Sequence, residues 1–351
     1  MNIDSTRDES GQRDPAGLSV GFFQPEDAEG VAELFTSVYG DGYPAKIVYH
    51  PEQLIAAYKN RDNIPIVVRT PENRVVGYSS LFRVAPNRGV YEKGNGAVAK
   101  DFRNAGVMGM IFRYVRGILP ELNNIDVFFG EPVCNHIYIQ KAALANLPFV
   151  ETALEVDLMP AQAYEKERSA SGRVSTLLMF ITIASKPHAV FLPNVYADCM
   201  RYIYEGLDDK RSFAVSTAKC SSLRQTRIDT QVFDSAHVAR LTVHYAGSDF
   251  QKIFLAEERR LRSRDLRVIQ VYLKLSWPWI TRIVTQLRKN SYFFGGLLPQ
   301  WFGEDGFLMQ KILSRPNWEG IQLFSERANR ILEFVNADWR KTANLRELNC
   351  Y

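Results

Sequence analysis

The chain has 351 residues, of which 46% are hydrophobic and 23% are charged, and its formal net charge at pH 7 is +4. This length favours two domains, and the composition is that of a globular protein, which excludes a largely disordered chain. Because the excess of basic over acidic residues is small, the composition argues against a nucleic-acid partner.

Residues 1–17 form a polar segment, for which we predict a disordered tail. This segment lacks the apolar core of a secretory signal, and the apolar stretch 177–184 is far too short to span a bilayer. The cysteines have neither CxxC nor metal-ligand spacing; they are Cys134, Cys199, Cys220 and Cys350. We therefore expect a cytoplasmic protein with reduced thiols, no metal and no membrane partner.

Short apolar strands and amphipathic helices alternate between residues 18 and 162. The predicted strands are 21–24, 64–69, 75–84, 91–100, 125–130 and 149–158. The predicted helices are 25–38, 51–58, 108–118 and 137–145. This order predicts an α/β domain, in which an α+β mixed sheet has helices on both faces.

The most informative local pattern is Gly96–Met108, in which a short apolar strand enters a basic turn that contains Gly106. An amphipathic helix follows, with apolar residues at Ile111, Val115 and Ile118. The first turn of a helix has N–H groups without intrahelical partners, and the helix dipole is positive there. The pattern therefore predicts a site for an anion such as a phosphate group.

A polar segment at 163–174, with serine and glycine at its centre, predicts a linker between two domains, 18–162 and 175–351. Landmarks of the first domain recur in the same order in the second: 48–51 at 190–193, 127–129 at 271–273, and 147–149 at 291–293. Their nearly constant offset predicts two copies of one fold.

The second copy has no recognisable phosphate loop at the corresponding place, 243–249. The segment has a glycine but no Arg-x-x-Gly pattern, and the carboxylate of Asp249 would repel a phosphate. Ser276 is predicted to cap the next helix, with Pro278 in its first turn. The apolar stripe of this helix predicts that it packs in the core; the stripe is Ile280, Ile283, Val284 and Leu287.

Two other segments of the second half have unusual compositions. The arginine-rich segment 257–267 is interpreted as a solvated helix end, with a phosphate-binding face as the alternative. The aromatic, glycine-rich segment 292–302 is interpreted as a buried hairpin, and the alternative is a wall of an acceptor pocket or an inter-domain surface.

The N-terminal half, over about residues 19–160, resembles the GNAT superfamily of N-acetyltransferases. Strand 97–100 and turn 103–108 are similar to the superfamily's Arg/Gln-x-x-Gly-x-Gly/Ala pyrophosphate loop and the strand before it. Residues 128–136 resemble the strand that splays away to open the acyl-CoA cleft, and 149–152 resemble the closing strand. The resemblance implies two tandem acyl-CoA N-acyltransferase (GNAT-like) domains, of which the second is degenerate.

The resemblance implies acetyl-CoA as cosubstrate, with its pyrophosphate on the N–H groups of the turn and its pantetheine arm paired with the strand. Asn135 would bind the pantetheine amides, or it caps the following helix. The implied cofactor-binding residues are Val98, Ala99, Arg103, Asn104, Ala105, Gly106, Val107, Met108 and Asn135.

The sequence departs from the superfamily pattern at three positions. Met108 replaces the small residue at the end of the loop, where it would crowd the phosphates. Pro148 replaces the glycine that usually precedes the phenylalanine of the closing strand. Leu144 stands where many relatives have the tyrosine that protonates the departing thiolate.

An amine must be neutral to attack a thioester, so a carboxylate, a histidine or a water chain should take its proton. Glu131 at the end of the splayed strand and Glu92 near the start of the motif strand are candidate bases, or else structural or surface residues. His136 is a candidate base, a CoA contact or a helix cap. The loop that often borders the acceptor site supplies candidate substrate contacts, which are otherwise turn residues: Tyr39, Asp41 and Tyr43.

The sequence thus predicts an N-acyltransferase that moves an acetyl group from acetyl-CoA to the primary amine of a small metabolite in a ternary complex. The alternative is a non-catalytic acyl-CoA-binding sensor or scaffold, favoured by Leu144 and Met108. A Fem-type aminoacyl transferase is a third hypothesis, against which the lack of a strong basic groove argues. The acceptor, the acyl chain length and a homodimeric state remain open.

Overall fold

The computed structural model describes residues 17–43, 45–122, 125–161, 170–207, 210–216, 220 and 224–348. All but the last residue of the predicted tail lies outside these ranges, as do Cys350 and most of the predicted linker. The chain divides into two compact units, residues 1–130 with 142–148 and residues 131–141 with 149–351.

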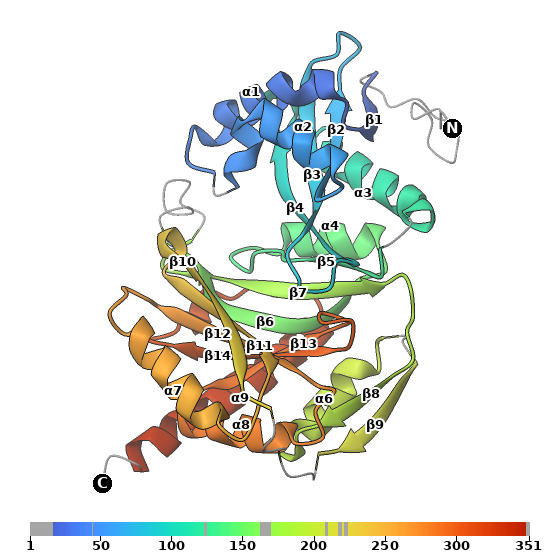
Figure 1. The fold of residues 1–351 in the computed structure, drawn as a ribbon. Coiled ribbons are helices and arrows are strands. Elements are labelled where there is room, and N and C mark those ends of the chain that lie inside the picture. Colours follow the sequence, from blue (N-terminus) through green and yellow to red (C-terminus); the bar gives the residue numbers. More distant parts are fainter. Residues whose placement is uncertain are drawn as a thin grey trace. The chain divides into compact units, whose positions relative to one another are not determined.

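The first unit is a sheet with helices on its faces (Figure 1). Its strands are β1 (Ser19–Phe22), β2 (Asn63–Arg69), β3 (Val75–Arg83), β4 (Val90–Val98) and β5 (Val127–Gly130), in that order across the sheet. Its helices are α1 (Ala28–Tyr39), α2 (Pro51–Lys59) and α3 (Val107–Ile118), with 3₁₀ turns at Pro25–Asp27, Lys46–Tyr49, Lys100–Phe102 and Leu119–Glu121. Neighbouring strands are antiparallel except β4 and β5, which are parallel.

Helices α1 and α3 cover opposite faces of this sheet. Successive residues of a strand point to opposite faces. In β3, the Tyr78 ring lies 5.2 Å from the ring of Phe35 in α1. A Cβ atom on Gly77 would lie 2.4 Å from Cγ1 of Val107 in α3. The predicted mixed α/β class with helices on both faces is therefore confirmed.

The second unit contains a larger mixed sheet. Its strand order is β7-β6-β13-β14-β12-β11-β10, and β8 and β9 form a separate parallel pair. The strands are β6 (Val150–Met159), β7 (Val174–Thr182), β8 (His188–Leu192), β9 (Arg211–Val215), β10 (Arg227–Phe233), β11 (Val238–Tyr245), β12 (Val268–Lys274), β13 (Phe293–Leu298) and β14 (Gly306–Ile312). The helices are α6 (Ala197–Tyr204), α7 (Phe250–Leu261), α8 (Ile280–Lys289) and α9 (Glu326–Leu348), with 3₁₀ turns at Asn194–Tyr196, Asp234–Ala236 and Trp318–Gly320. Helix α4 (Tyr138–Asn146) begins in this unit and ends in the first.

The second unit repeats part of the first in its order of elements. Strand β11, helix α7 and parallel strand β12 follow one another as β4, α3 and β5 do. Two of the three sequence landmarks fall on equivalent elements, because 127–129 and 271–273 lie in β5 and β12, and 149 and 293 lie at the start of β6 and β13.

The first landmark is wrong. Residues 48–51 span a 3₁₀ turn and the start of α2, whereas Val190–Leu192 lie in strand β8. A better counterpart of Pro193 is Pro25, because each lies between a strand and a helix at the start of a 3₁₀ turn. Proline is common at helix starts in general, so a shared proline does not say which helix it opens.

Three other predictions for the second half have clear outcomes. Helix α8 begins at Ile280 with Trp279 as its N-cap, so Ser276 is not the cap; its hydroxyl donates to Glu304 instead. The predicted apolar stripe of α8 is buried as expected. The segment 292–302 contains β13, whose residues are all buried. The arginine side chains of segment 257–267 are exposed.

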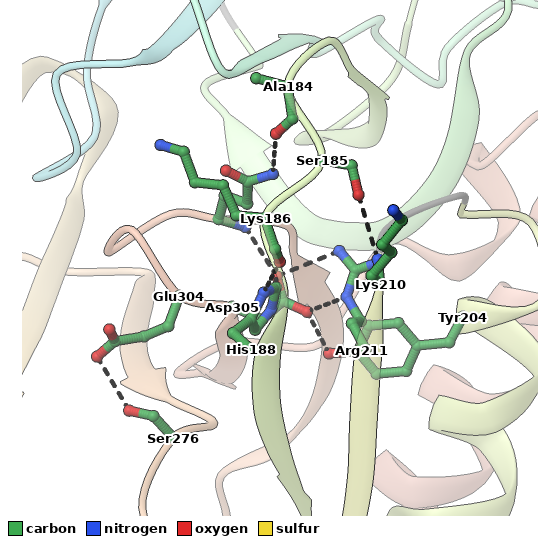
Figure 2. A network of polar contacts seen from close by, with 11 residues as sticks. Ala184, Ser185, Lys186, His188, Tyr204, Lys210, Arg211, Ser276, Glu304 and Asp305 are labelled. Atoms are coloured by element: carbon green, nitrogen blue, oxygen red, sulfur yellow. Dashed lines mark hydrogen bonds and ion pairs between the residues drawn. The ribbon is translucent and has the colours of Figure 1, made fainter.

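A charged cluster is buried where β8, β9 and the turn before β14 meet (Figure 2). The Asp305 carboxylate accepts from Arg211 Nε at 2.5 Å, from the Tyr204 hydroxyl at 2.9 Å and from the main-chain N–H of Gln300 at 2.9 Å. Its other ion pair is with His188 Nε2 at 3.1 Å. Burial alone would raise the pKa of Asp305, but the bonds from His188 and Arg211 hold that pKa well below its ordinary value.

No helix within the described ranges is both long and apolar enough to cross a membrane. Among the same residues, no group of three or more histidine, cysteine and acidic side chains is arranged to hold a metal ion.

Candidate functional site

The predicted anion loop lies between β4 and α3 in the first unit. Asn104 and Gly106 have left-handed backbones, with φ of 69° and 76°, and the Ala105 N–H donates to the Phe102 carbonyl. A Cβ atom on Gly106 would meet nothing within 4 Å, so this glycine is needed for its φ and not for space. Gly106 is the N-cap of α3, and no side chain caps the helix there.

The turn encloses a shallow hollow of about 370 Å³. The residues that line it are Val98, Phe102, Arg103, Asn104, Gly106, Val107, Met108 and Gly109. The N–H groups of the first turn of α3 have no intrahelical partner, and the helix dipole adds positive potential. Together with the Arg103 guanidinium, they suit the hollow to a phosphate or pyrophosphate group.

Six of the predicted cofactor-binding residues therefore line one hollow, and Ala105 lies within the same turn. Ala99 is different, because its N–H already donates to the Val76 carbonyl at 2.9 Å. This N–H group therefore cannot also donate to a pantetheine arm. A contact between the arm and Ala99 would have to use a different atom of this residue.

Strand β4 has an open edge beside the hollow. Its parallel pairing with β5 covers only Val90–Lys93, while its pairing with β3 continues to Val98. Among the described residues of this unit, the stretch Gly94–Val98 thus has a strand partner on one side only. A β-bulge interrupts the β3 pairing here, where Asn95 has a φ of 54°. Since β5 ends at Gly130, this stretch of β4 has an edge that suits pairing with an extended ligand, and the predicted splaying of 128–136 stays a prediction.

The α1 face of this edge carries two of the predicted substrate contacts. The Tyr39 hydroxyl donates to the Gly96 carbonyl at 3.0 Å, and the Tyr43 hydroxyl lies 3.4 Å from Asn95 Oδ1. The two tyrosine rings are 4.8 Å apart. Asp41 is exposed, and its main-chain carbonyl accepts from the ammonium of Lys46. The loop thus brings Tyr39 and Tyr43 to the bulge of β4, and Asp41 lies on its outer side.

The α3 face carries a residue that the sequence analysis missed. The Lys93 ammonium lies 3.2 Å from Ser79 Oγ and 4.0 Å from the centre of the Phe112 ring. Burial lowers the pKa of Lys93 to about 8. In the sequence, Lys93 stands in a strand that also contains Glu92 and Asn95, so it looks like an ordinary lysine on a strand edge.

Met108 lines the hollow, and its predicted crowding of the phosphates stays a prediction. Its methyl group lies 3.3 Å from where a Cβ atom on Gly96 would be, so the side chain packs against β4. Gly96 has no side chain, which leaves room for the methionine beside the turn.

The candidate bases lie in different parts of the chain. Glu92 is in β4, with its carboxylate next to Gly94. Glu131, Asn135 and His136 follow β5 and belong to the second unit. Asn135 is buried, and burial lowers the pKa of His136. The roles of these four residues remain predictions.

In the second unit, the turn between β11 and α7 is occupied by the chain itself. Asp249 is the N-cap of α7, and its carboxylate accepts from the Thr226 N–H and hydroxyl at 3.0 and 2.7 Å. These hydrogen bonds hold the pKa of Asp249 below its ordinary value. A Cβ atom on Gly247 would lie 2.1 Å from the Arg224 carbonyl oxygen. The predicted absence of a phosphate loop at 243–249 therefore has a physical cause.

Aromatic side chains fill the gap that follows the β11–β12 pairing. That pairing ends at Thr242 and Tyr272. Beyond it, the ring of Tyr245 lies 6.3 Å from that of Trp277 and 5.8 Å from that of Trp279, whose indole N–H donates to the Ala246 carbonyl. In the second unit these rings thus occupy the region that corresponds to the open edge of β4.

Comparison with solved structures finds acetyltransferases at low sequence identity. The ribosomal-protein-S5-alanine acetyltransferase of Vibrio fischeri is 14% identical, with a TM-score of 0.38, over 47% of this chain and 93% of that one. The spermidine/spermine N-acetyltransferase of Vibrio cholerae is 13% identical, with a TM-score of 0.37, over 48% and 93%. The ribosomal-protein-S18-alanine N-acetyltransferase of Escherichia coli is 12% identical, with a TM-score of 0.36, over 48% and 96%. No protein-family model and no curated protein sequence matches the chain.

Proposed function

We propose that the protein is a cytoplasmic N-acyltransferase, which moves an acetyl group from acetyl-CoA to the primary amine of a small metabolite in a ternary complex. The observation that carries this proposal is the uncapped N-terminus of α3 beside the open edge of β4. The first suits a pyrophosphate and the second an extended amide-containing arm, and CoA has both in that order.

The two faces of the first unit suit the two substrates. The pyrophosphate hollow is at the N-terminus of α3, so the CoA arm would run along β4 on that side. Tyr39 and Tyr43 lie at the same strand on the α1 face, and we assign them to the acceptor. Glu92 is the carboxylate in β4 that we assign to take the proton of the attacking amine, directly or through water.

Calorimetry tests the cosubstrate. The wild type should bind one acetyl-CoA, and Gly106→Glu should abolish the heat, because the new carboxylate repels the pyrophosphate. The matched control is Gly106→Asn, since asparagine tolerates a left-handed φ without adding charge. Equal heats for the wild type and Gly106→Glu, with both proteins folded by circular dichroism, would refute the proposal.

A non-catalytic acyl-CoA sensor is the second candidate, because Leu144 occupies the place of the usual tyrosine acid. Thiol release measured across a panel of amines separates the two functions. A sensor would bind acetyl-CoA but release CoA no faster with any amine than without one.

A further inference from the structure

The Lys93 side chain has surroundings that are unusual for a lysine. Its neighbours are Ser79 from β3, Phe112 from α3 and, at the paired position of β5, Gly130, none of which carries a charge. Among the described residues no carboxylate forms an ion pair with Lys93, and the alternation of side chains along β4 places Glu92 on the other face. A desolvated ammonium without a counter-charge costs stability, and such groups concentrate at functional sites.

Lys93 also lies on the path from the anion loop. Met108 at the first turn of α3 covers β4 at Gly96, and Phe112, one helical turn later, covers Lys93. These contacts define one continuous strip of the α3 face, which begins at the hollow. The strip ends where β4 and β5 part, because Lys93 and Gly130 are the last paired residues of the two strands.

The length of this strip matches the arm of CoA. Between the pyrophosphate and the sulfur the arm has about twelve bonded atoms, as many as four residues of main chain, so it spans roughly 14 Å when extended. Val98 and Lys93 are five positions apart in β4, which corresponds to about 16 Å, less the shortening at the bulge. A CoA with its pyrophosphate in the hollow therefore brings its sulfur to the neighbourhood of Lys93.

We propose that Lys93 is the proton donor to the departing thiolate of CoA, and this inference rests on the proposed acetyl transfer. The acceptor nitrogen forms a bond to the thioester carbon, the carbon–sulfur bond breaks, and the Lys93 ammonium gives one proton to the sulfur. The amine nitrogen loses its own proton to the base or to water, and neutral Lys93 regains a proton from water before the next turnover. The proton donor that this chain lacks at Leu144 is thus supplied from β4.

The acidity of Lys93 fits this role. Its pKa of about 8 is close to that of an ordinary thiol, so the proton transfer is nearly balanced and the ammonium is still the main form at pH 7. A lysine with an ordinary pKa near 10.4 would be a weaker acid.

The test compares the wild type with Lys93→Met and Lys93→Arg. Each variant is first titrated with acetyl-CoA by calorimetry, and CoA release with a saturating amine is then measured from pH 6 to 10. We expect acetyl-CoA affinity within about threefold of the wild type and kcat lower by 10²–10⁴, the usual contribution of a general acid. The wild-type kcat should fall above about pH 8, and the variants should lose this alkaline limb.

Lys93→Arg separates proton donation from charge, because a guanidinium keeps the charge but does not give up its proton. A Lys93→Arg variant as fast as the wild type would overturn the assignment, as would an unchanged alkaline limb in Lys93→Met. If Lys93→Met does not fold, aminoethylation of Lys93→Cys restores an ammonium of lower pKa, and the alkaline limb should then return at lower pH. Failure of the wild type to bind acetyl-CoA would instead refute the proposed function itself.

Discussion

The β4–α3 and β11–α7 regions are the same strand–turn–helix built twice, and they differ in what lies at the helix N-terminus. In the first, left-handed Asn104 and Gly106 leave the first-turn N–H groups facing a hollow. In the second, Asp249 is the N-cap residue, its carboxylate accepts from Thr226, and the Arg224 carbonyl lies against Gly247 in the turn. Neither helix has a side-chain hydrogen bond at its N-cap, so the two regions differ in the acidic residue and in the segment that covers the turn of the second.

The strand gaps differ in the same way. After its parallel pairing, β4 keeps an open edge, whereas Tyr245, Trp277 and Trp279 fill the space beyond the β11–β12 pairing. In the second unit, the protein's own side chains thus occupy the turn before α7 and the space beyond the β11–β12 pairing. In the first unit, the corresponding turn and strand edge are the places that we assign to a ligand. Its stability should therefore depend on internal charges and rings, and the ligand should act on the first unit.

The largest effect is expected for Asp305→Ala, which leaves Arg211 and His188 buried without their carboxylate. Removing one partner of a buried ion pair costs about 3–5 kcal/mol of unfolding free energy, which urea denaturation would measure. Glu304→Ala is the matched control, because its ion pair with Lys274 is partly exposed and should contribute less than about 1 kcal/mol. Equal losses in the two variants would show that the buried cluster does not anchor the second unit.

The next effect concerns the support behind the first site. Gly77→Ala places a Cβ atom 2.4 Å from Val107, at the start of α3, and we expect this overpacking to cost about 1–3 kcal/mol. Acetyl-CoA affinity should fall as well, because the donors of α3 move. The double variant Gly77→Ala with Val107→Ala removes the clash and should recover affinity in calorimetry. A double variant whose loss of affinity equals the sum of the two single-variant losses would contradict this coupling.

A smaller effect is expected from the protonation of His188. Its hydrogen bond to Asp305 raises the pKa of His188 in the folded state. Protonated His188 therefore stabilises the fold fully below the unfolded pKa near 6.5, and this stabilisation is lost as pH rises through the pKa of the folded state. We expect urea stability to decrease by about 1–2 kcal/mol over this range. His188→Gln should flatten the profile, and an unchanged slope in that variant would assign the pH dependence elsewhere.

No gain of binding is expected from repairing one part of the second copy. Asp249→Gly removes the repelling carboxylate, but the Arg224 segment and the three aromatic rings still occupy the turn and the gap. Calorimetry with acetyl-CoA should give one site per chain in this variant, as in the wild type. A stoichiometry of two would mean that charge alone separates the two regions.

Local patterns were sufficient to predict the anion loop and most elements of the first unit. The strand before Gly106, the turn and the apolar stripe of α3 are encoded within about twenty residues, so their positions follow from periodicity and turn chemistry. The helix start at Ser276 was predicted wrongly, because a local pattern shows only that serine is a good N-cap residue. The Ser276 hydroxyl instead donates to Glu304, 28 positions away along the chain.

The features that the sequence did not predict depend on residues that are distant along the chain. Asp305 meets Arg211 across 94 positions, and Tyr43 meets Asn95 across 52. Lys93 has a special environment only because β3 brings Ser79 beside it and α3 brings Phe112 over it. Such partners follow from strand register and helix packing, which no local window specifies.

The shape of the anion loop has a consequence for the timing of ligand exchange. Two left-handed residues and the Ala105–Phe102 bond give the turn its form within the protein alone. A ligand that meets a preformed cradle has no loop to order, so little entropy is lost and capture proceeds at a rate set by encounter. The residence time of the cosubstrate should then be governed by how quickly its contacts break, and exchange at this end of the site should not wait for a slow conformational step.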